Sequence, residues 1–201
     1  IMSGISLLNS NKKITDDTIN DAISGNLCRC TGYSPIIKAI KSVANDRIAK
    51  NDNQTINKNR ENKLGNVTYF KPSNLKELKN YLNDVKDFQF LAGGTDLNLY
   101  RPIINQKEDK IICLDSIKEL SHIKHHKEKI ELGGAVTIEN FLEAIKSKMP
   151  QLIEILQRFG SPQIRNQGTI GGNLCTSSPI GDIAPILLIL NSDLKVFGRN
   201  G

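Results

Sequence analysis

The chain is poor in aromatic residues, lacks tryptophan and carries no long hydrophobic run, and these absences limit what it can be. Its longest apolar run, residues 186–190, is far shorter than the ~20 residues that a helix needs to cross a bilayer. By its length this run is expected to be a core segment. The chain also does not open with the cationic and apolar pattern of a secretory signal. We therefore expect a soluble, cytoplasmic protein that does not enter a membrane.

Positive charge is in excess, but it is not concentrated in one place. Lysine and arginine number 27 against 21 acidic residues, a formal charge of +6, and they are scattered among acids and asparagines. Surfaces that bind nucleic acids gather such charges into a stripe or patch. The sequence therefore predicts no nucleic-acid partner.

Residues that could perform catalysis by themselves are also missing. The sequence shows neither a Ser-His-Asp set nor paired carboxylates. His122, His125 and His126 lie close together, but they precede a lysine-rich turn and have no acidic partners at ligand spacing. They are expected to be exposed and solvated rather than to bind a metal. Any enzymatic chemistry is then expected to come from a cofactor.

What the chain does contain is a glycine-dense, oxygen-rich segment at residues 165–182. Its glycines allow backbone conformations that are closed to other residues, so amide groups can approach a ligand closely. Hydroxyl, amide and carboxylate groups come from Thr169, Asn173, Thr176, Ser178 and Asp182. We expect this segment to lie outside the core and to hold a nucleotide, with Asp182 capping the next helix, binding a ribose, or both.

A second glycine turn, Gly93-Gly94-Thr95-Asp96, directly follows a predicted strand at residues 88–92. Amides at such a turn, together with the start of a helix, favour phosphate binding. Taken alone, the glycine pair fits a tight structural turn equally well. It is neither a P-loop nor a G-x-G-x-x-G fingerprint. Two glycine-rich loops in one domain favour a dinucleotide, which needs anchors at both its pyrophosphate and its ring.

The pattern of apolar residues divides the chain into three parts. Residues 1–48 read as helices, with starts at Asp16-Asp17 and Ser34-Pro35. Residues 49–64 have the composition of a linker. From residue 65 onward strands and helices alternate in a mixed α/β pattern. The predicted strands are residues 67–70, 88–92, 111–114 and 130–132 with one near 196, and the predicted helices follow Asn74 and Thr137 and cover 152–159.

The pair Cys28-Arg29-Cys30 lies in a loop between two of the predicted helices. Cysteines so close together do not easily form a disulfide with each other, but both thiolates can reach one metal centre. Zinc and iron–sulfur sites need four ligands, and Cys113 and Cys175 are expected to be ordinary core or loop residues. The pair therefore lacks partners within the chain. This fits a fragment cut at both ends, and two incidental thiols remain the alternative.

Together these motifs resemble the iron–sulfur and flavin subunit of xanthine dehydrogenases, in the molybdenum hydroxylase family, over nearly the whole chain. Residues 26–33 look like half of the family's C-terminal 2Fe–2S motif, which is completed by an upstream Cys-x-x-Cys pair. Residues 90–97 look like its first FAD loop and residues 169–182 like its second. The resemblance assigns cluster ligation to Cys28 and Cys30, and FAD contacts to Phe90, Leu91, Ala92, Gly93, Gly94, Thr95, Asp96, Leu97, Phe159, Thr169, Ile170, Gly171, Gly172, Asn173, Thr176, Ser178 and Asp182.

The resemblance implies an α+β fold. Residues 1–48 would be the end of a helical 2Fe–2S domain, 49–64 a linker, and 65–201 a truncated FAD domain of the vanillyl-alcohol oxidase-like (PCMH) type. Electrons would leave hypoxanthine or xanthine at a molybdopterin on a separate large subunit. They would pass through two 2Fe–2S clusters to FAD and then to NAD⁺, in a hetero-oligomer. The alternatives are the matching subunit of an aldehyde or carbon monoxide dehydrogenase, and a binding module without catalysis.

Overall fold

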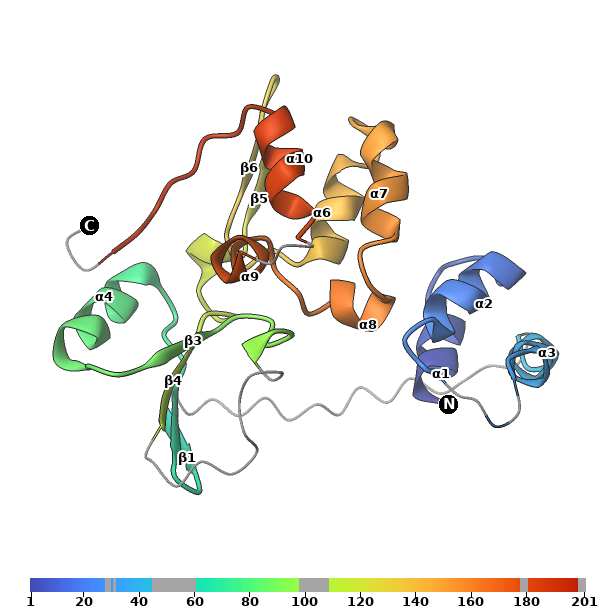
Figure 1. Cartoon of the computed structure of the whole chain (residues 1–201), viewed down its shortest axis with the longest axis horizontal. Coiled ribbons are helices and arrows are strands. Elements are labelled where there is room, and N and C mark those ends of the chain that lie inside the picture. The colour runs from blue at the N-terminus through green and yellow to red at the C-terminus, as the bar shows by residue number, and fades with distance from the viewer. Residues whose placement is uncertain (28–29, 31, 45–60, 98–108, 178–180, 199–201) are drawn as a thin grey trace. The chain divides into compact units, whose positions relative to one another are not determined.

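The structure is a computed structural model that describes residues 1–27, 30, 32–44, 61–97, 109–177 and 181–198 (Figure 1). The chain divides into two compact units. The first comprises Ile1–Asn57 and Arg158–Ile164, and the second comprises Lys58–Gln157 and Arg165–Gly201. In the described part of the chain, no helix is long and apolar enough to cross a membrane.

The first unit contains three helices, α1 (Met2–Leu8), α2 (Asp16–Ile23) and α3 (Ser34–Ser42). Each contributes apolar residues at helical spacing to one small core, which consists of Leu7, Ile19, Ile23 and Ile40. The predicted helices are therefore confirmed. The start of α3 differs by one position, because Tyr33 is the N-cap and Ser34 is the first helical residue. Ile36 on this helix and Val43 at its C-terminal end are exposed, and the helix buries Ile40.

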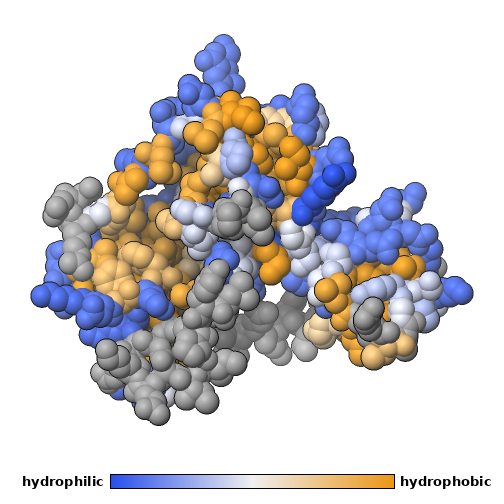
Figure 2. Space-filling model, viewed as in Figure 1, coloured by the Kyte–Doolittle hydropathy of each residue, from blue (hydrophilic) through white to orange (hydrophobic). Residues whose placement is uncertain are grey.

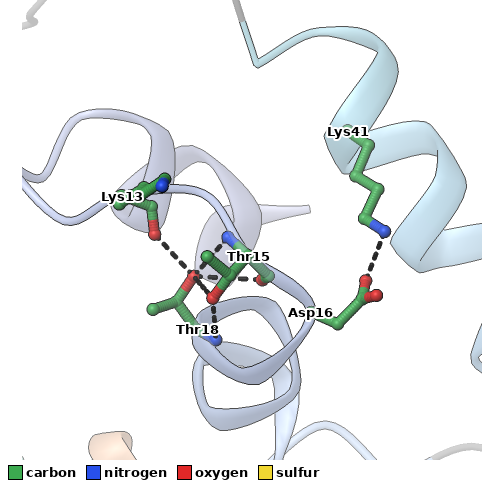
Figure 3. A network of polar contacts seen from close by, with 5 residues as sticks. All are labelled: Lys13, Thr15, Asp16, Thr18 and Lys41. Carbon is green, nitrogen blue, oxygen red and sulfur yellow. Dashed lines mark hydrogen bonds and ion pairs between the residues drawn. The ribbon is translucent and has the colours of Figure 1, made fainter.

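A reciprocal capping arrangement fixes the start of α2 (Figure 3). The Thr18 amide donates to Thr15 Oγ1 at 3.2 Å, and the Thr15 amide donates to Thr18 Oγ1 at 2.9 Å. Two amides that a helix start leaves without partners are satisfied in this way. Asp16 in the same turn forms an ion pair with Lys41 of α3, which links the two helices.

The second unit begins with a four-stranded sheet of order β1-β2-β4-β3, formed by β1 (Glu61–Leu64), β2 (Val67–Phe70), β3 (Gln89–Leu91) and β4 (Asp109–Cys113). Strand β1 pairs antiparallel with β2, whereas β2 and β3 both lie parallel to β4. The helix α4 (Leu75–Asp84), capped by Asn74, packs on the sheet through Leu78 and Leu82. Residues 61–64, which we expected to belong to the linker, are instead a polar edge strand held by pairing with β2.

The remainder of the second unit is mostly helical. Its elements are η1 (Lys118–Leu120), β5 (Ile123–His125), β6 (Ile130–Leu132), α6 (Ile138–Ile145), η2 (Pro150–Leu152), α7 (Ile153–Gln157), α9 (Ile170–Thr176) and α10 (Ile183–Ile189). The short helix α8 (Pro162–Arg165) crosses the division between the units, and only its Arg165 is grouped with the second. Strands β5 and β6 form an antiparallel hairpin. Thr137 caps α6 as predicted, and α6 buries Ile138, Phe141, Leu142 and Ile145. The predicted helix at 152–159 is shorter, because its start is 3-10 and its α-helical part ends at Gln157.

Two expectations near the C-terminal end were wrong. The apolar run 186–190 lies in or next to α10, but Leu188 and Ile189 are 80% and 83% exposed, and apolar side chains gather on the surface there (Figure 2). The helix begins at Ile183, three residues before the run, and its buried residues are Ile183 and Ile186, so only the first residue of the run is buried in the core. Residues 192–198 form no strand, although Val196 suggested one.

Candidate functional site

The two glycine-rich segments, 74 positions apart in the chain, lie against each other in the second unit. The first directly follows β3, and Gly93 packs so closely on the second that an added Cβ atom would lie 1.8 Å from Gln167 O. The same atom would lie 2.5 Å from the carbonyl carbon of Gln167. Only glycine permits this approach of two backbones. The tertiary structure therefore joins two segments that the sequence could only suggest as separate loops.

The first segment offers backbone donors. Gly94 adopts a left-handed conformation with φ +73°, and Thr95 and Asp96 continue the turn. Within the described residues, the amides of residues 93–96 donate to no group. Residues 93–96 are also partly exposed. Backbone amides in a glycine turn that lack partners can bind an anion such as phosphate.

The second segment differs from the expected loop, because its residues Ile170–Thr176 form the helix α9. All amides of its first turn have internal partners: Ile170 N donates to Val136 O at 3.0 Å, Gly171 N to Gly134 O at 2.8 Å, Gly172 N to Thr169 Oγ1 at 3.1 Å and Asn173 N to Thr169 O at 3.0 Å. A ligand can reach these amides only by displacing a bond of the fold. Contact of residues 170–173 with FAD stays a prediction, and their amides already have partners within the fold.

The expectation that this segment has no place in the core was wrong. Arg165, Thr169 and Ile170 are 2%, 6% and 5% exposed. The cause is backbone pairing, since Thr169 forms an antiparallel bridge with Thr137 and the Ile138 amide donates to Gly168 O at 2.9 Å. This pairing draws the segment into the core beside the start of α6.

In α9, the side-chain oxygen Oδ1 of Asn173 is the atom that most clearly indicates a ligand. The atom is buried and has no hydrogen-bond partner among the described residues. A buried acceptor without a donor is costly, and such atoms are rare in folded proteins. The close approach at Gly93, the unpaired amides at 93–96 and this acceptor fit a polar ligand that offers both an anionic group and donors. FAD has both, so the residues present fit the cofactor implied by the sequence.

Arg165, the first residue of the second segment, has a structural role. Its Nε donates to Glu139 Oε2 at 2.7 Å, and its Nη1 donates to Gln157 O at 2.9 Å. These bonds connect α8 to α6 and to the end of α7. Because the guanidinium is buried, its charge depends on Glu139 for compensation.

The other predicted FAD contacts are distributed around this pair of segments. Phe90 is 46% exposed and meets Phe88 edge-to-face with ring centroids 5.1 Å apart. Thr176 Oγ1 donates to helix carbonyls, and Asp182 is an exposed N-cap residue that makes no capping hydrogen bond. Leu91, Ala92 and Leu97 are partly exposed, and Ser178 lies outside the described residues. Phe159 belongs to the segment grouped with the first unit, where it is half-buried.

The structure describes some of the cysteines and not others. Cys28 lies outside the described residues, and Cys30 is exposed. Where the chain is described, no group of three or more metal-ligating side chains occurs, so ligation by Cys28 and Cys30 stays a prediction. Cys113 is buried in β4, and burial followed by the Asp115 carboxylate raises the pKa of its thiol, as expected for a core residue.

Sequence reasoning missed the turn Gly133-Gly134, which supports α9. A Cβ on Gly133 would lie 2.1 Å from Leu120 O, and Gly134 O accepts the Gly171 amide. A glycine pair directly after the predicted strand 130–132 was the available signal. One of the three histidines also has an acidic partner that its spacing in the sequence did not indicate. His122 Nε2 lies 2.7 Å from Glu131 Oε1, because the β5–β6 register brings these distant positions together.

Two family models match this chain. "FAD binding domain in molybdopterin dehydrogenase" matches residues 63–201, and "[2Fe-2S] binding domain" matches residues 1–41. The nicotinate dehydrogenase FAD-subunit of Eubacterium barkeri is 41% identical over 138 residues, which cover 66% of this chain and 46% of that protein. The abscisic-aldehyde oxidase of Arabidopsis thaliana is 27% identical over 96% of this chain and 18% of its own length. The rat xanthine dehydrogenase/oxidase is 24% identical over 99% of this chain and 19% of its own.

Solved structures agree with the family models. A carbon monoxide dehydrogenase from Hydrogenophaga pseudoflava superposes with a TM-score of 0.53 at 25% identity, over 59% of this chain and 42% of that one. The chain spans about a fifth of the length of the abscisic-aldehyde oxidase and the xanthine dehydrogenase. The α+β fold expected from the sequence is confirmed, with an FAD-binding domain of the molybdenum hydroxylase type. The chain belongs to the family of FAD binding domains of molybdopterin dehydrogenases, and it carries a [2Fe-2S] binding domain at its N-terminus.

Proposed function

We propose that this chain is the electron-transfer part of a cytoplasmic molybdenum hydroxylase of the xanthine dehydrogenase type. In this proposal electrons from hypoxanthine or xanthine reach a molybdopterin on a partner large subunit. They then pass through 2Fe–2S clusters to FAD and finally to NAD⁺. The observation that carries the FAD assignment is the approach of Gly93 to Gln167, which makes one site of two glycine-rich segments.

Different residues of this site would bind different groups of FAD. The unpaired amides of residues 93–96 would face the negatively charged pyrophosphate. The buried Asn173 Oδ1 would accept a hydrogen bond from a donor group of the cofactor. Gly171 and Gly172 would support α9 through their internal bonds rather than bind the ligand. When bound, FAD supplies the redox chemistry, and the protein supplies position and electrostatic surroundings.

The cluster would be held by Cys28 and Cys30 together with two ligands that are not in this sequence. The boundary between this helical domain and the FAD domain would lie before β1 rather than at 49–64, because residues 61–64 pair with β2. A longer form of the protein that carries an upstream Cys-x-x-Cys pair should show iron–sulfur absorption, and a Cys30→Ser change in it should remove the cluster but leave the flavin.

A second candidate is the FAD subunit of a nicotinate dehydrogenase. It is favoured by the 41% identity to the Eubacterium barkeri subunit, although that match covers 66% of this chain. The matching part of an aldehyde oxidase or carbon monoxide dehydrogenase, and a non-catalytic FAD-binding module, are further alternatives. Turnover assays of the assembled enzyme with xanthine, nicotinate and an aldehyde, with NAD⁺ as acceptor, would separate these candidates.

The first test of the proposal is FAD binding by the chain itself. We expect FAD to bind with quenching of its fluorescence and to be released on denaturation. Flavin is excited by visible light, which no protein side chain absorbs, so the emission of the protein does not obscure the flavin signal. FMN serves as the control ligand, since it lacks the pyrophosphate that the 93–96 amides would bind. Equal affinity for FMN and FAD, or no binding of either, would refute this assignment of the site.

Replacing Asn173 by leucine should separate binding from stability. The change removes a buried acceptor that has no donor in the described structure, so the free energy of unfolding without FAD should not fall. Affinity for FAD should drop about tenfold, as expected for the loss of one buried hydrogen bond. Urea unfolding and a fluorescence titration measure the two quantities. A destabilised chain with unchanged FAD affinity would show that Asn173 is a structural residue.

A further inference from the structure

A short segment from the sequence of the FAD domain is part of the first, helical unit. Residues Arg158–Ile164 lie within the stretch 63–201 that the FAD-binding family model matches, yet they are grouped with Ile1–Asn57. Gln157 before this segment and Arg165 after it both belong to the second unit. The helical unit therefore includes a contribution from the sequence of the FAD domain.

Within this segment, Gln163 binds two parts of the helical unit through one carboxamide. Its Nε2 donates to Ala22 O at 3.0 Å and to Ser3 Oγ at 3.1 Å, although these residues are 141 and 160 positions away in the chain. A side-chain amide nitrogen carries two protons, and each of these bonds uses one of them. Both donors are engaged, so the orientation of the carboxamide is fixed.

The first of these bonds caps the C-terminal end of α2. A helix leaves its last carbonyls without partners of its own. In the regular helical pattern Ala22 O would accept the Asn26 amide, but this amide donates to Ile23 O at 2.8 Å. The Gln163 carboxamide supplies a donor to Ala22 O in its place.

The second bond continues to the loop that follows α2. Ser3 Oγ accepts from Gln163 Nε2 and donates its own proton to Asn26 Oδ1 at 2.6 Å. Asn26 opens the loop that leads to Cys30, and both residues are exposed. Gln163 therefore holds the start of this loop twice, through the end of α2 and through the Asn26 side chain.

Gly25 leaves the space that this arrangement needs. A Cβ on Gly25 would lie 2.5 Å from Gln163 Oε1 and 2.7 Å from Ser161 Oγ. A larger residue at this position would push both side chains away from the end of α2. The segment 158–164 and the end of α2 thus fit each other closely at more than one residue.

We propose that Gln163 is a positioning residue, which lets a segment of the FAD domain sequence fix the start of the cysteine loop in the helical domain. The consequence for a 2Fe–2S cluster rests on the proposed function, whereas the positioning itself does not. Hydrogen bonds and solvent exposure around a cluster tune its properties. A displaced loop start would change both of these near Cys30.

Amide hydrogen exchange of the full chain, measured by NMR, tests the positioning. The variant Gln163→Glu keeps the size of the side chain but offers no donor at neutral pH. We expect the protection of the Asn26 amide to fall about fivefold, as for the loss of one ordinary hydrogen bond. The Ile19 amide, which donates to Thr15 O at 3.0 Å near the other end of α2, should keep its protection.

The matched control is Gln151→Glu, the same chemical change at an exposed position in η2 of the second unit. It should leave the protection of Asn26 unchanged. An unchanged Asn26 amide in Gln163→Glu, or the same fall in both variants, overturns the positioning. An equal fall at Ile19 and Asn26 also overturns it, because Gln163 would then only stabilise the helical unit as a whole.

The consequence for the cluster is tested in a longer form of the protein that carries the upstream Cys-x-x-Cys pair. Gln163→Glu should alter the electron paramagnetic resonance spectrum of the reduced cluster, and Gln151→Glu should not. An identical spectrum in Gln163→Glu overturns this consequence. If the unchanged protein forms no cluster, the cluster assignment in the proposed function is refuted, and the exchange result still decides the positioning.

Discussion

Replacing Gly93 by alanine should abolish or strongly weaken FAD binding. The added Cβ would lie 1.8 Å from Gln167 O, so the two glycine-rich segments would have to move apart by more than about 1 Å. Forcing a methyl group into such a contact costs about 1–3 kcal/mol. If that strain is relieved by separating the two walls of the site, affinity falls about tenfold to a hundredfold. A fluorescence titration with FAD measures the loss.

The control for this change is Gly198→Ala. Gly198 has no heavy atom within 4 Å of an added Cβ, so the same substitution there should leave FAD affinity unchanged. Far-UV circular dichroism of both variants shows whether the fold persists. A Gly93→Ala chain that is folded and binds FAD as the unchanged protein does would place the ligand elsewhere.

The second large effect is expected in folding rather than in binding. Replacing Arg165 by methionine removes a guanidinium that is 2% exposed and leaves the Glu139 carboxylate, 16% exposed, without its closest cation. Breaking a buried ion pair from one side costs about 3–5 kcal/mol. Since domains are stable by only about 5–15 kcal/mol, a large share of the stability would be lost. Urea unfolding followed by circular dichroism measures the change.

The double change Arg165→Met with Glu139→Leu tests the cause of this loss. Removing both charges leaves no buried carboxylate without a partner, so the double variant should recover much of the stability. Glu143→Gln is a suitable control, because Glu143 lies on the same helix and its ion pair with Lys146 is exposed. A double variant less stable than the Arg165→Met single variant would contradict the account of Arg165 as a charge compensated by Glu139.

Local patterns predicted the elements well where the apolar spacing was regular. The helices after Asn74 and Thr137 begin at those caps, because a side-chain acceptor and an apolar stripe are both encoded within a few residues. The hairpin strand β5 escaped notice because it is short and holds only one apolar residue. Strand β1 was mistaken for linker for a similar reason. Each of these strands forms because it pairs with a neighbouring strand. The composition of one strand alone does not predict that pairing.

In the candidate site, too, the sequence predicted the local features and not the contacts between distant residues. Glycine pairs and oxygen-bearing side chains marked both segments, because close backbone approach and polar contacts need those residue types. The amides of residues 170–173 donate to Val136, Gly134 and Thr169. The sequence did not indicate these hydrogen bonds. It also did not indicate that Arg165 is buried. The first fact depends on the pairing of residues 134–138 with residues 168–171, and the second on the contacts of Arg165 with Glu139 and Gln157.

By itself the sequence determined the class of fold, the family and the two segments that would surround a nucleotide. These follow from spacing and residue type, which act over a few positions along the chain. Only the tertiary structure decided that Gly93 meets Gln167, that the donors left for a ligand belong to the first segment, and that His122 finds Glu131. Each of these contacts joins backbones or charges far apart in sequence. Their partners are fixed by strand register and packing, which no short stretch of the chain encodes.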